Sequence, residues 1–239
     1  MPYYGYGYGY GMMWDPTYIL VLIGALLSMW ASSRVNSTFR RYSQVRSMTG
    51  MTGAEAATRL LHSQGIYDVT VRSVRGSLTD HYDPRTKTVN LSEAVYGASS
   101  VAAIGVAAHE CGHAIQDNVG YVPLKLRGAF VPIASIGSRL SLPLILMGVL
   151  IGLTPFIQIG IWMFVLAIAF QVITLPVEFN ASGRAIRLLE EQGILAGQEV
   201  DGTRKVLGAA ALTYVAAVAA SVLQLFRLLL LTRGSRDND

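Results

Sequence analysis

The string His109-Glu110-Cys111-Gly112-His113 holds two imidazoles and a carboxylate at a spacing that allows metal chemistry. Small apolar residues precede this HExxH string and favour a buried helix. Histidines four apart on a helix differ by only about 40° around its axis, so both can bind one zinc ion. Glu110 would lie beside the zinc, where it can take a proton from water. We therefore predict zinc-dependent hydrolysis, with His109 and His113 as ligands and Glu110 as catalytic base; the alternative is a helix whose histidines bind no metal.

A catalytic zinc site needs a third protein ligand besides the two histidines. The glycine and third histidine that extend the motif in one class of zinc proteases are missing after His113. Asp117 lies four residues after His113 and is geometrically possible, although crowded. Glu178 is the better candidate, since it follows Pro176 where a long apolar segment ends, and we expect it to open a helix there. The alternative role for Glu178 is a helix-N-terminal carboxylate stabilised by the helix dipole.

Other polar side chains carry weaker signals. His81, Tyr82 and Arg184 could each stabilise negative charge on a reacting carbonyl oxygen, but His81 fits an ordinary loop or sheet residue equally well. Cys111, the single cysteine, lies about 200° from His109 around the helix and should pack as a small apolar residue. A single cysteine excludes an intramolecular disulfide and implies no oxidising compartment.

The composition indicates a membrane protein. The chain of 239 residues is 52% hydrophobic and 14% charged, against about 25% charged in a typical soluble domain. Uncharged runs cover 18 residues from Pro16, 38 residues between Arg139 and Glu178, and 21 residues from Val206. The longest run exceeds one span and is interrupted at Thr154-Pro155, so we expect a hairpin of two helices. The net charge of +4 comes without a basic patch interleaved with aromatics, so no nucleic-acid partner is expected.

Arginines follow the first apolar segment and none precedes it, which argues against a cleaved signal peptide. By the positive-inside rule, the N-terminus then lies outside the cell and the HExxH string on the cytoplasmic side of the cell membrane. The predicted order is a Tyr/Gly-rich tail (1–15), a transmembrane helix (16–33), a cytoplasmic zincin-like region (34–130), a transmembrane hairpin (131–177), a cytoplasmic helix with the third ligand (178–205), a transmembrane or membrane-associated helix (206–231) and a tail (232–239).

Residues 66–92 differ from the helical remainder. Alternating apolar and polar residues predict strands at 69–74 and 86–91, with a turn at 82–85 between extended segments. An edge strand beside the HExxH helix could hydrogen-bond the backbone of an extended peptide. The predicted fold class is therefore a mostly α, multi-pass membrane protein, with a zincin-like helical region, a small β-sheet and about four transmembrane helices.

Long strings in the chain resemble the family of YugP-like neutral zinc metallopeptidases, membrane proteins of bacteria. The resemblance covers nearly everything except the Tyr/Gly tail, and the strings occur in the family's order. They include Thr52-Gly53-Ala54-Glu55-Ala56-Ala57, Leu78-Thr79-Asp80-His81-Tyr82-Asp83-Pro84-Arg85, Ala107-Ala108-His109-Glu110-Cys111-Gly112-His113-Ala114, Leu175-Pro176-Val177-Glu178-Phe179 and Leu212-Thr213-Tyr214-Val215-Ala216-Ala217.

This family is similar to the HtpX-like gluzincin proteases, in which the glutamate of a Glu-x-x-Ala-Asp string is the third zinc ligand. The resemblance puts that glutamate at Glu178, while Ser182 stands where those relatives have aspartate. It implies a membrane-bound zinc endopeptidase that cleaves peptides or membrane proteins. The alternative is a non-catalytic zinc-binding scaffold or quality-control partner. A transporter or channel is disfavoured because the apolar segments carry almost no charged residues.

Overall fold

A computed structural model describes residues 15–234, with side chains described through residue 232. The predicted Tyr/Gly-rich tail, up to residue 14, and the last five residues lie outside the described part. The elements in chain order are α1 (Tyr18–Ser43), α2 (Gly53–Ser63), β1 (Thr70–Val74), β2 (His81–Asp83), β3 (Thr88–Ser92), α3 (Glu93–Tyr96), α4 (Val101–Asn118), α5 (Val122–Ile151), α6 (Thr154–Glu191) and α7 (Gln198–Gly234). The predicted fold class, mostly helical with a small sheet and about four long apolar helices, is confirmed.

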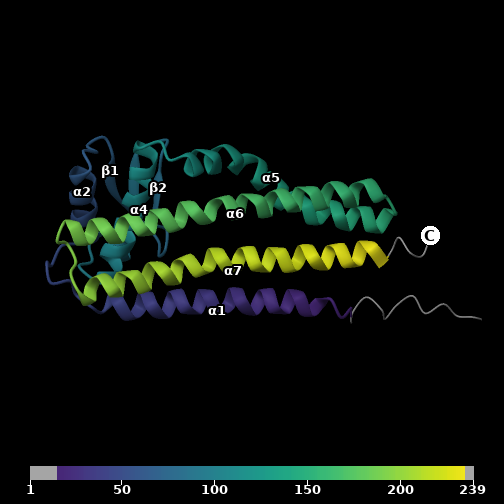
Figure 1. The fold of residues 1–239 in the computed structure, drawn as a ribbon, viewed down its shortest axis with the longest axis horizontal. Helices are drawn as coiled ribbons and strands as arrows, with labels where there is room; N and C mark the ends of the chain where they lie inside the picture. The colour runs from purple at the N-terminus through teal and green to yellow at the C-terminus, as the bar shows by residue number, and fades with distance from the viewer. Residues whose placement is uncertain (1–14, 235–239) are drawn as a thin grey trace, which may run out of the picture.

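Four of the described helices, α1, α5, α6 and α7, are long and apolar enough to cross a membrane. The helices α1 and α7 run antiparallel and side by side, with α6 next to α7 (Figure 1). Large apolar side chains on these helices point outward, including Trp30 at 56% exposure and Leu150 and Trp162 at 72%. Such surfaces are unfavourable in water and suit contact with lipid. The fold therefore indicates a membrane protein.

The helices α5 and α6 form an antiparallel hairpin. Gly152 ends α5 with a φ of 70°, a left-handed conformation that glycine adopts without strain. A Cβ added at Gly160 would lie 2.7 Å from the backbone oxygen of Ser141, so the two helices pack backbone against backbone. The first helix is longer than predicted, since it begins at Val122 rather than residue 131. A proline in its first turn suits this start.

The helix α6 corrects one local prediction. Glu178 was expected to open a new helix after Pro176, but α6 runs continuously through both residues. Proline removes one backbone hydrogen bond from a helix, and the packing of α6 against α4 around Val177 and Ala181, both 0% exposed, maintains the helix here. Glu178 therefore lies deep inside a helix, and the alternative reading of a helix-N-terminal carboxylate is wrong.

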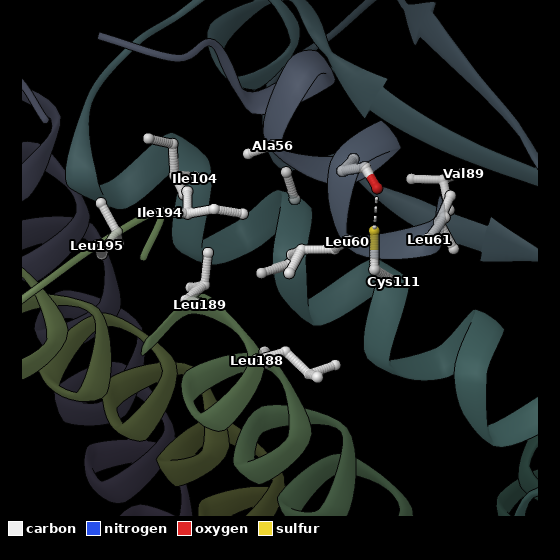
Figure 2. Packing of buried hydrophobic residues seen from close by; sticks show 14 of the residues in the cluster. Ala56, Leu60, Leu61, Val89, Ile104, Cys111, Leu188, Leu189, Ile194 and Leu195 are labelled. Atoms are coloured by element: carbon white, nitrogen blue, oxygen red, sulfur yellow. Dashed lines mark hydrogen bonds between the residues drawn. The ribbon is translucent and has the colours of Figure 1, made fainter. Parts of the chain in front are cut away.

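One end of the molecule has its own hydrophobic core, built from α2, α4, the sheet and the adjoining ends of α6 and α7 (Figure 2). Leu60, Leu91 and Ile104 are completely buried in it. The thiol of Cys111 packs there as predicted and donates a hydrogen bond to the Ala57 carbonyl, with the sulfur 3.5 Å from the oxygen. Burial raises the pKa of the Cys111 thiol, which keeps it protonated and unsuited to bind a metal.

The sheet has the order β1-β3-β2, with β1 parallel and β2 antiparallel to the central β3. The two predicted strands correspond to β1 and β3. The predicted turn at 82–85 is partly wrong, because Tyr82 and Asp83 pair with Val89 and Thr88 and belong to β2. The short β2 is stabilised by this pairing and by its contact with α4, which local sequence does not reveal. As an edge strand, β2 lies beside the HExxH helix.

At the opposite end of the molecule, Arg227 of α7 makes a charged contact with the residues at and just before the start of α1. Arg227 lies 3.6 Å from the carboxylate of Asp15 and 4.0 Å from the centre of the Tyr18 ring. A cation in an apolar helix needs such partners when it is withdrawn from water. The pairing explains how α7 carries Arg227 within an otherwise apolar segment.

Candidate metal centre

The helix α4 carries both histidines on one face. Ser100 caps its N-terminus by accepting a hydrogen bond from the Ala103 amide. The first turns of α4 consist of small apolar residues, most of which are buried. The His109 and His113 rings lie edge to face with their centroids 4.7 Å apart. Both side chains are largely buried, with exposures of 15% and 11%. The four-residue spacing therefore brings the two imidazoles together, as expected for helical neighbours.

Glu178 of α6 faces this histidine pair. Its Oε2 atom lies 3.3 Å from Nε2 of His109 and 3.7 Å from Nε2 of His113. One nitrogen from each ring and one carboxylate oxygen lie within 4.8 Å of one another, although the two helices are far apart in sequence. The structure thus brings together the three residues predicted as metal ligands.

Gly112 explains how α4 and α6 approach so closely. A Cβ at this position would lie 2.6 Å from the backbone oxygen of Ala181, closer than a side chain allows. Glycine here permits direct contact between the two backbones. Because Ala181 is less than one turn beyond Glu178, this contact sets the distance between that carboxylate and the histidines.

A chain of hydrogen bonds orients His113. The Gln116 amide nitrogen donates to the Val177 carbonyl over 2.8 Å and to Asn180 Oδ1 over 3.0 Å. The Gln116 amide oxygen therefore faces His113 and accepts from Nδ1 over 3.0 Å. Nδ1 therefore carries a proton, and when His113 is neutral the Nε2 lone pair points toward Glu178.

His109 has a matching contact on its other nitrogen. Its Nδ1 atom lies 3.1 Å from the hydroxyl oxygen of Ser182, which leaves Nε2 facing Glu178. A neutral hydroxyl orients the ring without adding a second negative charge near the centre.

Arg127 of α5 contacts the other oxygen of Glu178. Its guanidinium donates to Oε1 over 2.9 Å, and the Glu178 side chain is only 4% exposed. The remaining oxygen, Oε2, has no hydrogen-bond partner among the described residues. Arg127 thus holds one carboxylate oxygen, while the other is directed at the two imidazoles.

The grouped atoms fit a zinc ion. In the neutral form of His113, Nε2 presents a lone pair toward Oε2 of Glu178, and this buried oxygen has no compensating donor among the described residues. Such an arrangement is unfavourable unless a cation or proton lies between the atoms. Two imidazole nitrogens and one carboxylate oxygen form a known catalytic zinc set that leaves a coordination position free.

Glu110 lies beside the three grouped residues and is not one of them. Its Oε2 atom accepts a hydrogen bond from the backbone amide of Tyr82 in β2 over 3.0 Å. The side chain lines two cavities, both of which are also lined by His109 and Glu178. Its carboxylate is therefore fixed at the centre yet accessible from both cavities.

The remaining predicted residues lie farther from the three grouped atoms. Asp117 accepts hydrogen bonds from Tyr82 and Lys87 and is not part of the group. Burial, and then the bond to Asp117, raises the pKa of the Tyr82 phenol, which stays protonated. His81 and Tyr82 line the larger cavity, whereas Arg184 donates to Asn180 and lines neither cavity.

Sequence reasoning missed two residues at the centre, Arg127 and Tyr214. Tyr214 of α7 lines both cavities together with His109, Glu110 and Glu178. The sequence signal for these two residues was weak, because each is an isolated polar side chain at or within a long apolar segment. Only the folding of α5 and α7 around α4 brings them to the histidines.

The fold and this group define a class of protein: a helical membrane protein with a buried histidine, histidine and glutamate centre. The family described as "Putative neutral zinc metallopeptidase" matches residues 17–233, and the chain belongs to this family. The chain is also 47% identical over 223 residues to the "Putative membrane protease YugP" of Bacillus subtilis (strain 168). The aligned residues cover 93% of this chain and 99% of that protein. No solved structure gives a significant match to the chain.

Proposed function

We propose that this protein is a membrane-bound zinc endopeptidase in which His109, His113 and Glu178 hold the metal and Glu110 is the general base. The observation that carries this proposal is the buried Glu178 oxygen, which has no hydrogen-bond partner within the described part of the chain and faces two imidazole nitrogens. Family membership independently supports zinc and peptidase activity. The glutamate as third ligand makes the centre gluzincin-like.

The chain's own residues support hydrolysis of a peptide bond. When bound, zinc would polarise the scissile carbonyl and lower the pKa of water toward about 7. Glu110 takes a proton from the attacking water as the new carbon–oxygen bond forms. It then passes that proton to the leaving amine as the carbon–nitrogen bond breaks. The Tyr82 amide holds one Glu110 oxygen and leaves the other for this proton transfer.

The orientation in the membrane is also a proposal. The arginines after the first apolar helix, by the positive-inside rule, favour a cytoplasmic centre; they are Arg34, Arg40, Arg41, Arg46 and Arg59. The native Cys111 is buried, so a cysteine introduced at exposed Ser77 can be labelled selectively. In intact cells, we expect Ser77→Cys to react with an impermeant maleimide only after permeabilisation. Labelling without permeabilisation would place the centre outside.

The decisive activity test compares Glu110→Gln with a matched control. We expect purified wild type in detergent to cleave casein, and Glu110→Gln to lose about 10²- to 10⁴-fold in rate because the proton acceptor is removed. Glu190→Gln removes an exposed carboxylate of α6 and should leave the rate unchanged. If Glu110→Gln cleaves as fast as wild type, the alternative of a zinc-binding scaffold or quality-control partner is favoured.

A further inference from the structure

Two cavities flank the metal centre. The smaller has a volume of about 170 Å³ and the larger about 580 Å³. Five residues line both cavities, namely Asp80, His109, Glu110, Glu178 and Tyr214. A peptide that occupies both cavities would therefore contact His109, Glu110 and Glu178.

The smaller cavity has an apolar wall. Residues of α1, α4 and α7 that carry no hydrogen-bonding side chain form a large part of this wall; they include Val35, Phe39, Val106, Val206, Ala210 and Ala211. An apolar cavity of about 150 Å³ is known to hold one benzene molecule. The observed volume of about 170 Å³ therefore matches one large aliphatic or aromatic side chain.

The larger cavity differs from the smaller one in its volume and in the basic side chains of its lining. It is bordered by the edge strand β2 and by α5, and its lining includes the polar or charged side chains of His81, Lys125 and Arg127. A cavity of this volume, bordered by an edge strand, suits several residues of an extended chain. The two sides of the centre are thus suited to different parts of one substrate.

Building on the proposed peptidase function, we propose that the smaller cavity is the specificity pocket for one large apolar side chain next to the scissile bond. The larger cavity holds the neighbouring residues of the same substrate chain. An apolar side chain is favoured in the smaller cavity because a charged one would lose hydration against the apolar wall formed by residues such as Val35, Phe39 and Val206. The pocket lies against α1 and α7, both candidate membrane helices, so segments leaving the membrane are well placed to enter it.

Two substitutions on α7 change the pocket in opposite directions. Ala210→Leu fills part of the smaller cavity, whereas Val206→Ala widens it. One methylene in an apolar pocket changes discrimination by about 10- to 200-fold. We expect Ala210→Leu to shift cleavage toward small side chains at one position beside the scissile bond, and Val206→Ala to shift it toward larger ones.

Casein digestion followed by mass-spectrometric mapping of the cleavage sites measures these shifts. The matched control is Ala217→Leu, which adds the same atoms at an exposed position of α7 and should leave the sites unchanged. Zinc content of each variant shows that the centre remains folded. Cleavage sites that stay the same in both pocket variants would overturn the specificity pocket and leave the proposed function intact.

A binding measurement separates this inference from the proposed function. In the Glu110→Gln protein, a pentapeptide containing photo-leucine should crosslink to residues 206–211, and Ala210→Leu should abolish that crosslink. If no variant cleaves casein but the crosslink forms and depends on Ala210, the peptidase proposal fails while the apolar binding pocket stands. If the crosslink maps elsewhere, the pocket is overturned.

Discussion

Similar apolar residues are buried at one end of the molecule and exposed at the other. Around α4, Leu60, Leu91 and Ile104 are completely buried. At the hairpin turn, Leu150 and Trp162 are 72% exposed. The first end folds around its own core, whereas the second has a surface suited to lipid. The difference teaches that apolar composition alone does not tell a core helix from a membrane helix.

The proposed metal centre lies where these two regions meet. The helix α4 supplies the histidines from the compact end, while α6 supplies Glu178 from a helix that continues to the hairpin turn. Arg127 adds a contact from α5, the other hairpin helix. Metal binding should therefore couple the compact end to the hairpin, which the following predictions test in order of decreasing effect on the centre.

Removal of zinc should have the largest effect on the stability of the folded protein. A ligand present at about a thousandfold excess over its Kd stabilises the folded state by about 4 kcal/mol. We expect EDTA to lower the midpoint of thermal unfolding of the detergent-purified protein, as followed by circular dichroism, and zinc to restore it. An unchanged midpoint would mean that no bound metal joins the two regions.

Gly112→Ala should separate α4 from α6. The added Cβ meets the Ala181 backbone oxygen, and overpacking of this kind costs about 1–3 kcal/mol. We expect lower thermal stability together with weaker zinc binding, measured by metal titration. The control Gly183→Ala lies on α6 with nothing within 4 Å of its new Cβ and should bind zinc normally. Equal zinc affinity in both variants would contradict the role of this contact.

Arg127→Gln should weaken zinc binding without unfolding the protein. Loss of a partner that orients a metal ligand commonly reduces metal affinity about 10- to 100-fold. Competition with a fluorescent chelator measures this affinity, and Arg127→Lys should restore part of it. Arg187→Gln breaks an exposed ion pair on α6 and is the matched control. A normal affinity in Arg127→Gln would show that Glu178 needs no such contact.

Gly160→Ala should leave the centre least affected. Its Cβ would collide with the Ser141 backbone oxygen and with Ile145 in the hairpin. We expect a lower unfolding temperature and unchanged zinc affinity, because the collision lies far along α6 from Glu178. Gly208→Ala, with nothing within 4 Å of its Cβ, is the stability control. A loss of zinc affinity in Gly160→Ala would mean that the two regions are coupled more tightly than the fold suggests.

Local spacing in the sequence predicted the features that depend on neighbouring residues. The HExxH string predicted the pairing of His109 and His113, and uncharged runs predicted the long apolar helices. Features that depend on distant segments were not predictable in this way. The contact of Gly112 with Ala181 and that of Arg127 with Glu178 arise only when α4, α5 and α6 fold together.

Glu178 combines a feature that the local sequence predicts with one that depends on packing between distant segments. Its place after a long apolar segment made it the best candidate for the third ligand, and the structure brings it to the histidines. Its helical setting was mispredicted, because Pro176 usually signals a helix boundary. Packing against α4 overrides that local signal.

The most direct test of the central claim is the zinc content per chain, measured by mass spectrometry of the metal, in three detergent-purified proteins. Wild type and Glu110→Gln should each contain one zinc per chain, because Glu110 is not a ligand. Glu178→Ala should lose the zinc while its helices remain folded by circular dichroism. Zinc retained in Glu178→Ala, or absent from folded wild type, would contradict the assignment of His109, His113 and Glu178 as the metal centre.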